Sequence, residues 1–300
     1  MYKKFIGQLE IQSMVWPGII FLLIFSYFPM YGILIAFKDY DILQGITSSD
    51  WAGLEHFREF FNDPNFMQVL KNTLTINMLA LAIAFPAPII FALLLNEITN
   101  NKFRRLVQSI SYLPHFVSWV IFGGLIINIL SPSNGILNEI LLTIGVLKEP
   151  LSFMSEPQYF KYILVLGETL KGLGWGAIIY IAAIAGVDAE LYEAAKIDGA
   201  GRFQKMWHIT LPSIMGTIVI MLIFAISSLL NSGFEQILVL QNVLNRETSE
   251  TIDTYVYKLG FESMRYSYST AVGLAKSIIA VILLLAANHI SKRITNKGLF

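Results

Sequence analysis

Six apolar segments, each roughly 20 residues long, constrain this chain more than any other feature. A bilayer core about 30 Å thick is crossed by a helix of about 20 predominantly apolar residues. The six segments cover residues 14–37, 72–96, 108–130, 162–186, 212–231 and 269–290. We therefore predict an all-α integral membrane protein with six transmembrane helices, organised as a single domain over residues 1–300.

Composition supports a lipid environment and excludes several other classes. Of the 300 residues, 55% are hydrophobic and only 14% are charged, whereas an average soluble domain has about 25% charged residues. Lysine plus arginine and aspartate plus glutamate both number 21, so no basic excess attracts nucleic acid, and none is expected as a partner. The chain has no cysteine, which excludes disulfides, thiolate metal sites and cysteine nucleophiles.

The distribution of basic residues predicts the orientation in the membrane. Six spans put both termini on one side, and that side has 11 lysines and arginines in the termini and short connections, against 8 in the longer loops opposite. By the positive-inside rule the short basic connections are cytoplasmic. The first apolar run is too long for a signal peptide and no A-x-A site follows it, so it is a retained span. We predict a multi-pass plasma (inner) membrane protein with both termini in the cytoplasm.

The connection over residues 188–211 predicts a short helical elbow on the cytoplasmic side. Asp188 is a favourable N-cap, and Gly199 can adopt the positive φ of a residue that terminates a helix. A second short helix over residues 202–209 is expected to follow, with Pro212 in the first turn of the next span. The first helix has a small apolar face, which suits docking into a groove of another protein. That face contains Leu191, Ala194 and Ala195.

The elbow contains a spaced motif. Its fixed positions read E-A-A, three residues, G, nine residues, I-x-L-P, and they fall on Glu193-Ala194-Ala195, Gly199, Ile209 and Leu211-Pro212. This pattern resembles the signature of the permease subunits of binding-protein-dependent ABC importers. The segments at 111–114 and 191–200 are similar to the carbohydrate-type, maltose-permease-like branch, and most of all to permeases for complex polysaccharides and oligosaccharides. A leucine stands at position 170, where relatives often have an aromatic residue.

The resemblance implies a type I ABC importer permease fold in which the elbow is the coupling helix, seated in a cleft of an ATPase subunit. The coupling residues carried over are Leu191, Glu193, Ala194, Ala195, Asp198 and Gly199. The implied function is translocation of a carbohydrate, expected to be an oligosaccharide, across a bacterial plasma membrane. The implied partners are a second homologous permease subunit, two ATPase subunits, an extracellular solute-binding protein, membrane lipid and the carbohydrate substrate.

The chain lacks the G-x-x-x-x-G-K-[ST] loop that holds nucleotide phosphates. ATP hydrolysis is therefore expected on the partner ATPase, which would bind ATP and Mg²⁺, and this chain is not expected to be an enzyme. We assign it no cofactor and no metal site.

Charged groups inside the apparent spans predict the substrate pathway, because each costs about 2.5–3.5 kcal/mol to insert and usually faces a bundle interior or a wet cavity. Glu168 and Lys171 share a helix face, so an internal ion pair is one interpretation. With Lys276 they leave one surplus positive charge, which favours an acidic saccharide such as a uronate oligomer. The predicted pathway residues are Lys171, Glu168, Trp175, Lys276, Asn231, Ser228, Asn128 and Trp119.

Alternative interpretations of these features remain open from the sequence. An ion-coupled secondary transporter would use Glu168 and Lys171 as its coupling site, but it leaves the elbow unexplained. An intramembrane hydrolase would need a nucleophile motif that the chain lacks. The prolines in the second span and the glycines in the fourth indicate either hinges or close helix packing. The aromatic residues of 251–268 favour an interfacial helix on lipid, with contact to an extracellular partner as the alternative.

Overall fold

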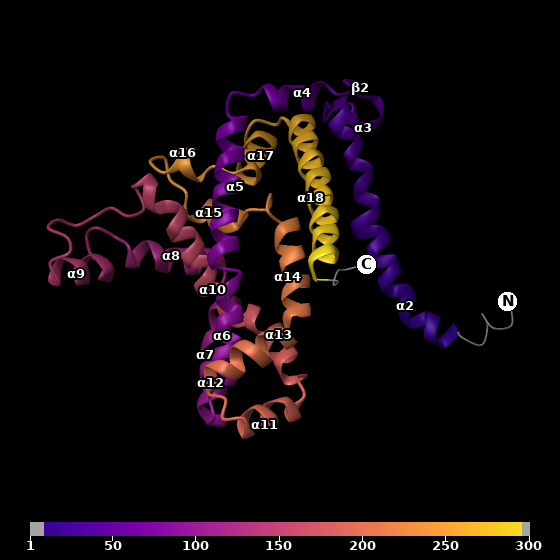
Figure 1. Cartoon of the computed structure of the whole chain (residues 1–300). Coiled ribbons are helices and arrows are strands. Elements are labelled where there is room, and N and C mark those ends of the chain that lie inside the picture. The colour runs from indigo at the N-terminus through magenta and orange to yellow at the C-terminus, as the bar shows by residue number, and fades with distance from the viewer. Residues whose placement is uncertain (1–8, 296–300) are drawn as a thin grey trace. The chain divides into compact units, whose positions relative to one another are not determined.

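The computed structural model describes residues 9–295 of the chain (Figure 1). Lys3, Lys4 and Lys297, which contribute to the predicted orientation, lie outside the described residues. The elements in chain order are α2 (Leu9–Leu22), η1 (Leu23–Tyr27), η2 (Phe28–Phe37), β1 (Lys38–Asp39), α3 (Gly45–Ser48), β2 (Asp50–Trp51), α4 (Glu55–Asn62), α5 (Phe66–Ile83), α6 (Pro86–Asn96), α7 (Asn101–Phe116), α8 (Trp119–Ile129), α9 (Ile136–Thr143), α10 (Pro157–Ala185), α11 (Ala189–Ile197), α12 (Arg202–Lys205), η3 (Met206–Thr210), α13 (Leu211–Ser213), α14 (Met215–Ser227), α15 (Phe234–Leu240), α16 (Arg246–Ser249), α17 (Ile252–Tyr257), η4 (Lys258–Glu262) and α18 (Tyr266–Thr295).

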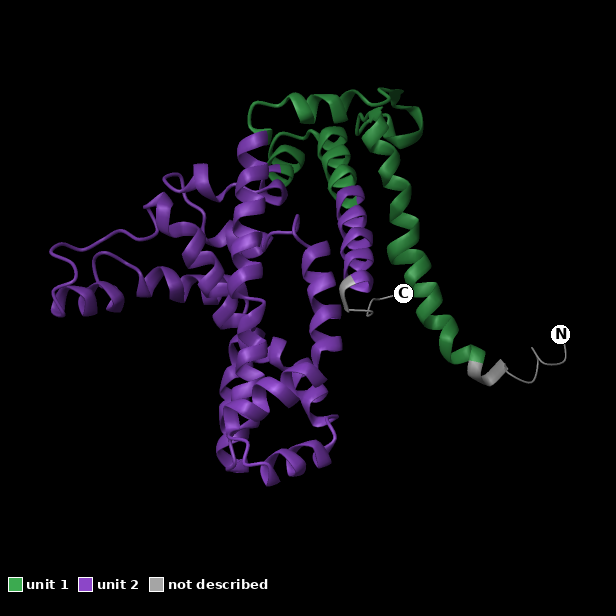
Figure 2. Cartoon of the chain, viewed as in Figure 1, with its two compact units in different colours: residues 1–66, 256–277 green, residues 67–255, 278–300 purple. Residues whose placement is uncertain are grey.

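The chain forms two compact units (Figure 2). Unit 1 consists of residues 1–66 and 256–277, and unit 2 consists of residues 67–255 and 278–300. The first unit contains the first long helix and the segments that follow it. The second contains the elbow and most of the other helices, so the candidate sites below lie within it.

In unit 1 a buried lysine binds the loop that follows the first predicted span. The two short strands pair antiparallel, with Lys38 opposite Trp51. The Lys38 ammonium donates three hydrogen bonds of 2.7–3.0 Å to the backbone oxygens of Ile46, Thr47 and Ser49. Because all three ammonium donors are used, this buried charge is fully hydrogen-bonded and fixes the loop after the first span.

The aromatic residues near the start of α18 differ from the interfacial belt that the sequence favours. Tyr268 is buried, and its hydroxyl donates to a carboxylate oxygen of Asp63 at 2.9 Å. Its ring lies edge-on to Phe60, with 6.2 Å between the ring centroids, and Phe60 packs in turn against Phe66. Tyr268 therefore belongs to an internal aromatic cluster of unit 1, because a neighbouring acid satisfies its hydroxyl.

Four helices of the described chain are long and apolar enough to cross a membrane: Gln12–Phe37, Phe66–Asn96, Pro157–Ala185 and Tyr266–Arg293. They match the first, second, fourth and sixth predicted spans. The second includes a short irregular turn between α5 and α6, just before Pro86, as the prolines predict.

The third and fifth predicted spans are not single straight helices. The third falls on α7 and α8, which meet at 103°, and the fifth falls on the helical segment Arg202–Ser213 and α14, which meet at 64°. The first break has a local cause, since Val117 and Ser118 adopt extended backbone conformations and the Ser118 hydroxyl accepts a bond from the Ile121 N–H, starting a new helix. If each bent pair is one span, the described chain has up to six spans, by length and composition.

Two glycines of α10, Gly174 and Gly176, serve close packing and not bending. α10 is continuous over 29 residues and packs against α6 and α7. A Cβ atom on Gly174 would lie 2.2 Å from the backbone oxygen of Ser111, and one on Gly176 would lie 3.0 Å from Pro88. Small residues let helices approach closely in membranes, which accounts for both positions.

We predict that Gly174→Ala destabilises the protein by about 1–3 kcal/mol, because the added methyl group collides with backbone that cannot move away alone. Gly172→Ala is the matched control, since a Cβ there meets nothing within 4 Å. It is expected to be neutral or slightly stabilising, as alanine favours helix over glycine. Thermal unfolding of both variants in detergent checks this, and equal melting temperatures would contradict the packing role of Gly174.

Candidate functional site

The elbow is a capped helix followed by a tight reversal. The Asp188 carboxylate accepts the Glu190 N–H at 3.0 Å, which is the predicted N-cap. At the other end the Ala200 N–H bonds to the Ala195 oxygen at 2.8 Å, and Gly199 has φ +77°. These features define a glycine-terminated helix end, in which a residue with a Cβ would be strained at position 199. The prediction for Gly199 is confirmed.

The second arm of the elbow differs in length from the prediction. Helical structure runs from Arg202 to Ser213, and the break comes at Ile214, so Pro212 lies in the last turn before the break and not in the first turn of the span. The Tyr192 hydroxyl bonds to the Thr210 hydroxyl at 2.9 Å and joins the two arms. The elbow is thus a braced unit and not a loose loop.

The elbow is also anchored to the core of unit 2. Met206 and Leu211 of the second arm pack against a buried cluster drawn from α6, α10 and the break before α14. That cluster consists of Ile89, Ala92, Leu93, Ala177, Tyr180, Ile184 and Ile214. The second arm of the elbow is therefore packed directly against α6 and α10.

The outer face of the elbow exposes large apolar side chains. Ile197, Phe203 and Trp207 are 87%, 80% and 67% exposed, and Leu191 is also exposed. The sequence analysis named Leu191, Ala194 and Ala195 but missed the other three, although large apolar residues among charged ones in a short connection are a visible signal. Figure 1 shows α11 and α12 together at the end of unit 2 where α7 begins. An apolar patch rimmed by charges is typical of a protein interface.

The coupling residues that the resemblance implies lie on α11 and at its C-terminal end. Glu193, Ala194, Asp198 and Gly199 are exposed, whereas Ala195 is half-buried. The Glu193 and Asp198 carboxylates form no ion pair within the part of the chain that the structure describes. The face therefore offers two acids and several apolar side chains to a partner, a combination that suits a groove with a basic rim.

Lys171 hydrogen-bonds the backbone at the break between α7 and α8. It is 8% exposed, and its ammonium donates to the backbone oxygens of His115 at 2.7 Å and Pro114 at 3.3 Å. It also lies 5.4 Å from the centre of the Trp119 ring. A cation is favoured at a helix C-terminus, and here it satisfies carbonyls that the bend has freed. The ion pair with Glu168 that the sequence analysis considered is not formed, because Lys171 is turned toward α7.

Trp175 belongs to the same neighbourhood. Its ring stacks on His115 with 4.5 Å between the centroids and 1° between the planes, and Phe116 meets it edge-on. Trp175 remains partly exposed. The structure therefore brings Lys171, Trp119 and Trp175 together around the break, while Asn128 lies exposed further along α8.

A separate cavity of ≈ 240 Å³ collects other predicted pathway residues. Glu168, Ser228 and Asn231 line it, together with Asn77, Ala80, Leu81, Ala84, Phe85, Ala225 and Leu229. Asn77 was missed by the sequence analysis, and its amide donates to the Leu229 oxygen at 2.9 Å. The lining offers hydroxyl, amide and carboxylate groups beside apolar walls, which suits the hydroxyl groups and ring faces of a sugar.

Lys276 lies in unit 1 and is half-buried there on α18. Its role in the pathway remains a prediction, because it does not line the cavity beside Glu168.

Comparison with known proteins places the chain in a family. Residues 84–296 match the family described as binding-protein-dependent transport system inner membrane component. Protein LplB of Bacillus subtilis (strain 168) is 46% identical over 284 residues, covering 95% of this chain and 89% of LplB. The polygalacturonan/rhamnogalacturonan transport system permease protein YteP of the same organism is 45% identical, covering 99% of this chain and 92% of YteP.

Solved structures agree over the full length. A chain of a bacterial alginate ABC transporter, crystallised in complex with an alginate pentasaccharide-bound periplasmic protein, superposes with a TM-score of 0.90 at 39% identity, covering 100% of this chain and 99% of that one. A second structure of an ABC transporter that imports the acidic polysaccharide alginate gives 0.89 at 39% identity, covering 98% and 99%.

This chain belongs to the family of binding-protein-dependent transport system inner membrane components. It is a membrane-embedded permease subunit of a carbohydrate-type ABC importer and not an enzyme, and it has the permease fold that the motif in the elbow predicts. Membership of this family excludes the ion-coupled secondary transporter that the sequence alone left open.

We predict that Lys171→Met destabilises the protein by about 1–3 kcal/mol, because two carbonyls at the end of α7 lose the hydrogen bonds that the buried ammonium donates to them. Lys161→Met on the same helix is the control, since no hydrogen bond or ion pair is found for Lys161 in the described structure. A double-mutant cycle between Lys171→Met and Glu168→Gln is expected to give a coupling energy below about 0.5 kcal/mol. A coupling energy above about 1 kcal/mol would contradict this prediction and indicate that Lys171 and Glu168 form an ion pair.

Proposed function

We propose that this chain is one of two permease subunits that together form the pore of a bacterial importer for an acidic oligosaccharide. The single observation that supports the substrate class best is the similarity to two kinds of relatives. YteP carries the name of a polygalacturonan/rhamnogalacturonan permease, and the similar solved structures import the acidic polysaccharide alginate. The second permease subunit, two ATPase subunits and an extracellular solute-binding protein complete the proposed assembly.

The elbow is the proposed attachment point for the ATPase. Its exposed apolar side chains Ile197, Phe203 and Trp207 would enter a groove, and Glu193 would meet a basic residue at the groove's rim. The rigid turn at Gly199 and the bond between Tyr192 and Thr210 hold the face in shape. ATP and Mg²⁺ would bind to the partner, whose movement the anchored elbow would pass to α6 and α10.

The proposed orientation puts both termini and the elbow in the cytoplasm. The excess of basic residues in the short connections supports it. An ATPase has access to nucleotide on the cytoplasmic side, which is the side where the elbow must then lie.

The proposed pathway uses two kinds of groups. The cavity beside Glu168, Ser228 and Asn231 would bind sugar hydroxyls, since it contains one acid and no base. The aromatic rings of Trp119 and Trp175 would stack on sugar faces, and Asn128 would add a hydrogen bond. Lys276 is the proposed partner of substrate carboxylates, because a lysine inside an apparent span usually faces a bundle interior or a wet cavity.

We predict that Glu193→Lys and Gly199→Pro uncouple ATP hydrolysis from uptake while the protein remains in the membrane. The first reverses a charge at the proposed contact, and the second forbids the positive φ of the turn. Uptake in vesicles containing the assembled transporter is expected to fall at least tenfold, the effect of about 1.4 kcal/mol lost from the contact.

Glu139→Lys on α9 is the control, because it makes the same charge reversal at an exposed position outside the elbow. Normal uptake by both elbow variants, or an equal loss in the control, would contradict the coupling assignment.

We predict that wild-type vesicles take up unsaturated or saturated oligouronates and that Lys276→Gln reduces this uptake more than it reduces uptake of neutral oligosaccharides of equal length. The reason is that the variant removes charge while keeping a hydrogen-bonding side chain. Equal losses for both substrates would refute charge selection at this position and leave the family assignment intact.

A further inference from the structure

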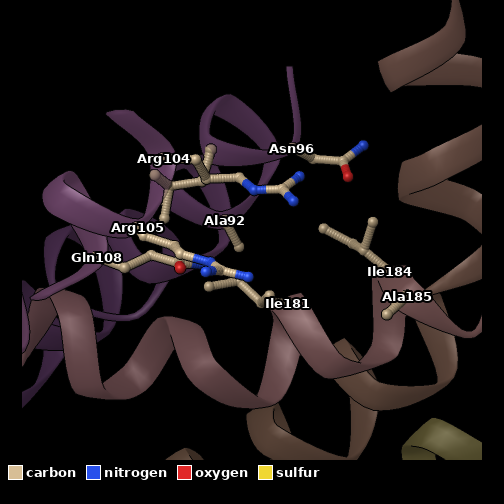
Figure 3. Close-up of a pocket in the computed structure, with 9 residues that line it drawn as sticks. Ala92, Asn96, Arg104, Arg105, Gln108, Ile181, Ile184 and Ala185 are labelled. Carbon is tan, nitrogen blue, oxygen red and sulfur yellow. The ribbon is translucent and has the colours of Figure 1, made fainter. Parts of the chain in front are cut away.

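A second cavity of ≈ 220 Å³ lies between three helices of unit 2 (Figure 3). It is formed by the end of α6, the first turns of α7 and the end of α10. Its lining consists of Ala92, Leu95, Asn96, Arg104, Arg105, Gln108, Ile181, Ile184 and Ala185. None of these residues belongs to the predicted coupling set or to the substrate pathway.

Two arginines dominate the polar side of this cavity. In Figure 3 the Arg104 side chain points toward Asn96, and the Arg105 side chain lies beside Gln108 and Ile181. Within the described residues neither forms an ion pair, and the only hydrogen bond found for either side chain runs from Arg104 to the Asn101 side chain at 2.9 Å. Each guanidinium has five donors, so most of them remain available to a ligand.

The basic residues at the start of α7 favour binding of an anion. Lys102, Arg104 and Arg105 occupy the first turns of α7, the positive end of the helix, where further cations are unfavourable. The acid that follows α6, Glu97, does not line the cavity and takes part in no ion pair of the described structure. A bound anion would therefore relieve repulsion as well as accept hydrogen bonds.

The opposite wall of the cavity is apolar. Ala92, Leu95 and Ile184 are buried, and Ile181 is half-buried. At about 30 Å³ per water molecule, the cavity is larger than a small ion with one or two waters needs. A ligand that matches both walls has a phosphate beside an apolar part, and basic pockets between transmembrane helices at the cytoplasmic side bind such lipid headgroups.

We propose that this cavity binds the phosphate of an anionic phospholipid, with Arg104 and Arg105 holding the phosphate and the apolar wall holding the glycerol and upper acyl region. Ala92 and Ile184 line the cavity and also belong to the core against which Met206 and Leu211 of the elbow pack. A lipid in this position thus stabilises the core that supports the elbow. The site is a lipid contact in addition to transport and does not depend on the identity of the sugar.

The test uses the full-length permease in detergent and native mass spectrometry to measure binding of phosphatidylglycerol, phosphatidylcholine and inorganic phosphate. Phosphatidylglycerol is expected to bind at least tenfold more tightly than the zwitterionic lipid. Arg104→Gln with Arg105→Gln is expected to weaken phosphatidylglycerol binding about 30-fold, as each basic residue near an anionic headgroup contributes about fivefold.

The control is Lys196→Gln with Lys292→Gln, which removes two exposed charges that neither line the cavity nor lie on α7, and it is expected to change binding less than twofold. Where the double arginine variant does not purify, Arg105→Gln alone serves, because no hydrogen bond of its side chain is found that its loss would break. It is expected to weaken binding about fivefold.

Four results would overturn the proposal. Equal affinity for both lipids would remove the role of the headgroup charge, and equal loss in the control would make the effect one of net charge. Binding of inorganic phosphate as tight as that of phosphatidylglycerol would mean that the apolar wall contributes nothing. The arginine variants could also bind lipid as the wild type does but lose the ATPase during purification. That result would mean that the cavity binds an acidic side chain of the ATPase instead of a lipid.

Discussion

Backbone groups at helix breaks must find hydrogen-bond partners away from water, and this requirement organises unit 2. An unpaired carbonyl in hydrocarbon costs several kcal/mol, so irregular backbone at membrane depth survives only where protein groups satisfy it. Lys171 bonds two carbonyls at the end of α7, and Asn77 bonds the Leu229 carbonyl after α14. A third such side chain, Gln236, bonds the Leu164 oxygen within the continuous helix α10 at 2.7 Å. Polar residues inside apparent spans are thus partly structural.

This requirement changes the meaning of intramembrane charge. A lysine three residues from a glutamate in one helix predicts an ion pair by spacing alone. The bend between α7 and α8 presents carbonyls that compete for the lysine, and a cation at a helix end with two short contacts is well satisfied. Glu168 is then left to the cavity that it shares with Ser228 and Asn231. The two charged residues therefore have different roles: Lys171 supports the fold, and Glu168 faces the proposed pathway.

Local signals predicted much of the molecule, and long-range packing decided the rest. The caps at Asp188 and Gly199 and four of the spans follow from short stretches of sequence, because hydropathy and capping depend on neighbours along the chain. The partner of Lys171 lies 56 residues away, so spacing within α10 could not identify it. Pro114 and Ser118 were the local hint of the break in the third span, but a smooth hydropathy profile concealed it. The exposure of Phe203 and Trp207 likewise depends on how the elbow folds back on α6 and α10.

The central claim is that the elbow of this permease receives the ATPase. Because the chain has no cysteine, a single Ala194→Cys substitution gives one defined site for thiol-to-amine cross-linking in membranes that contain the assembled transporter. The account predicts a product with the combined mass of permease and ATPase from this variant. It predicts none from Val243→Cys, which is also exposed and lies in the loop after α15. Cross-linking to the ATPase at position 243 and not at position 194 would contradict the account.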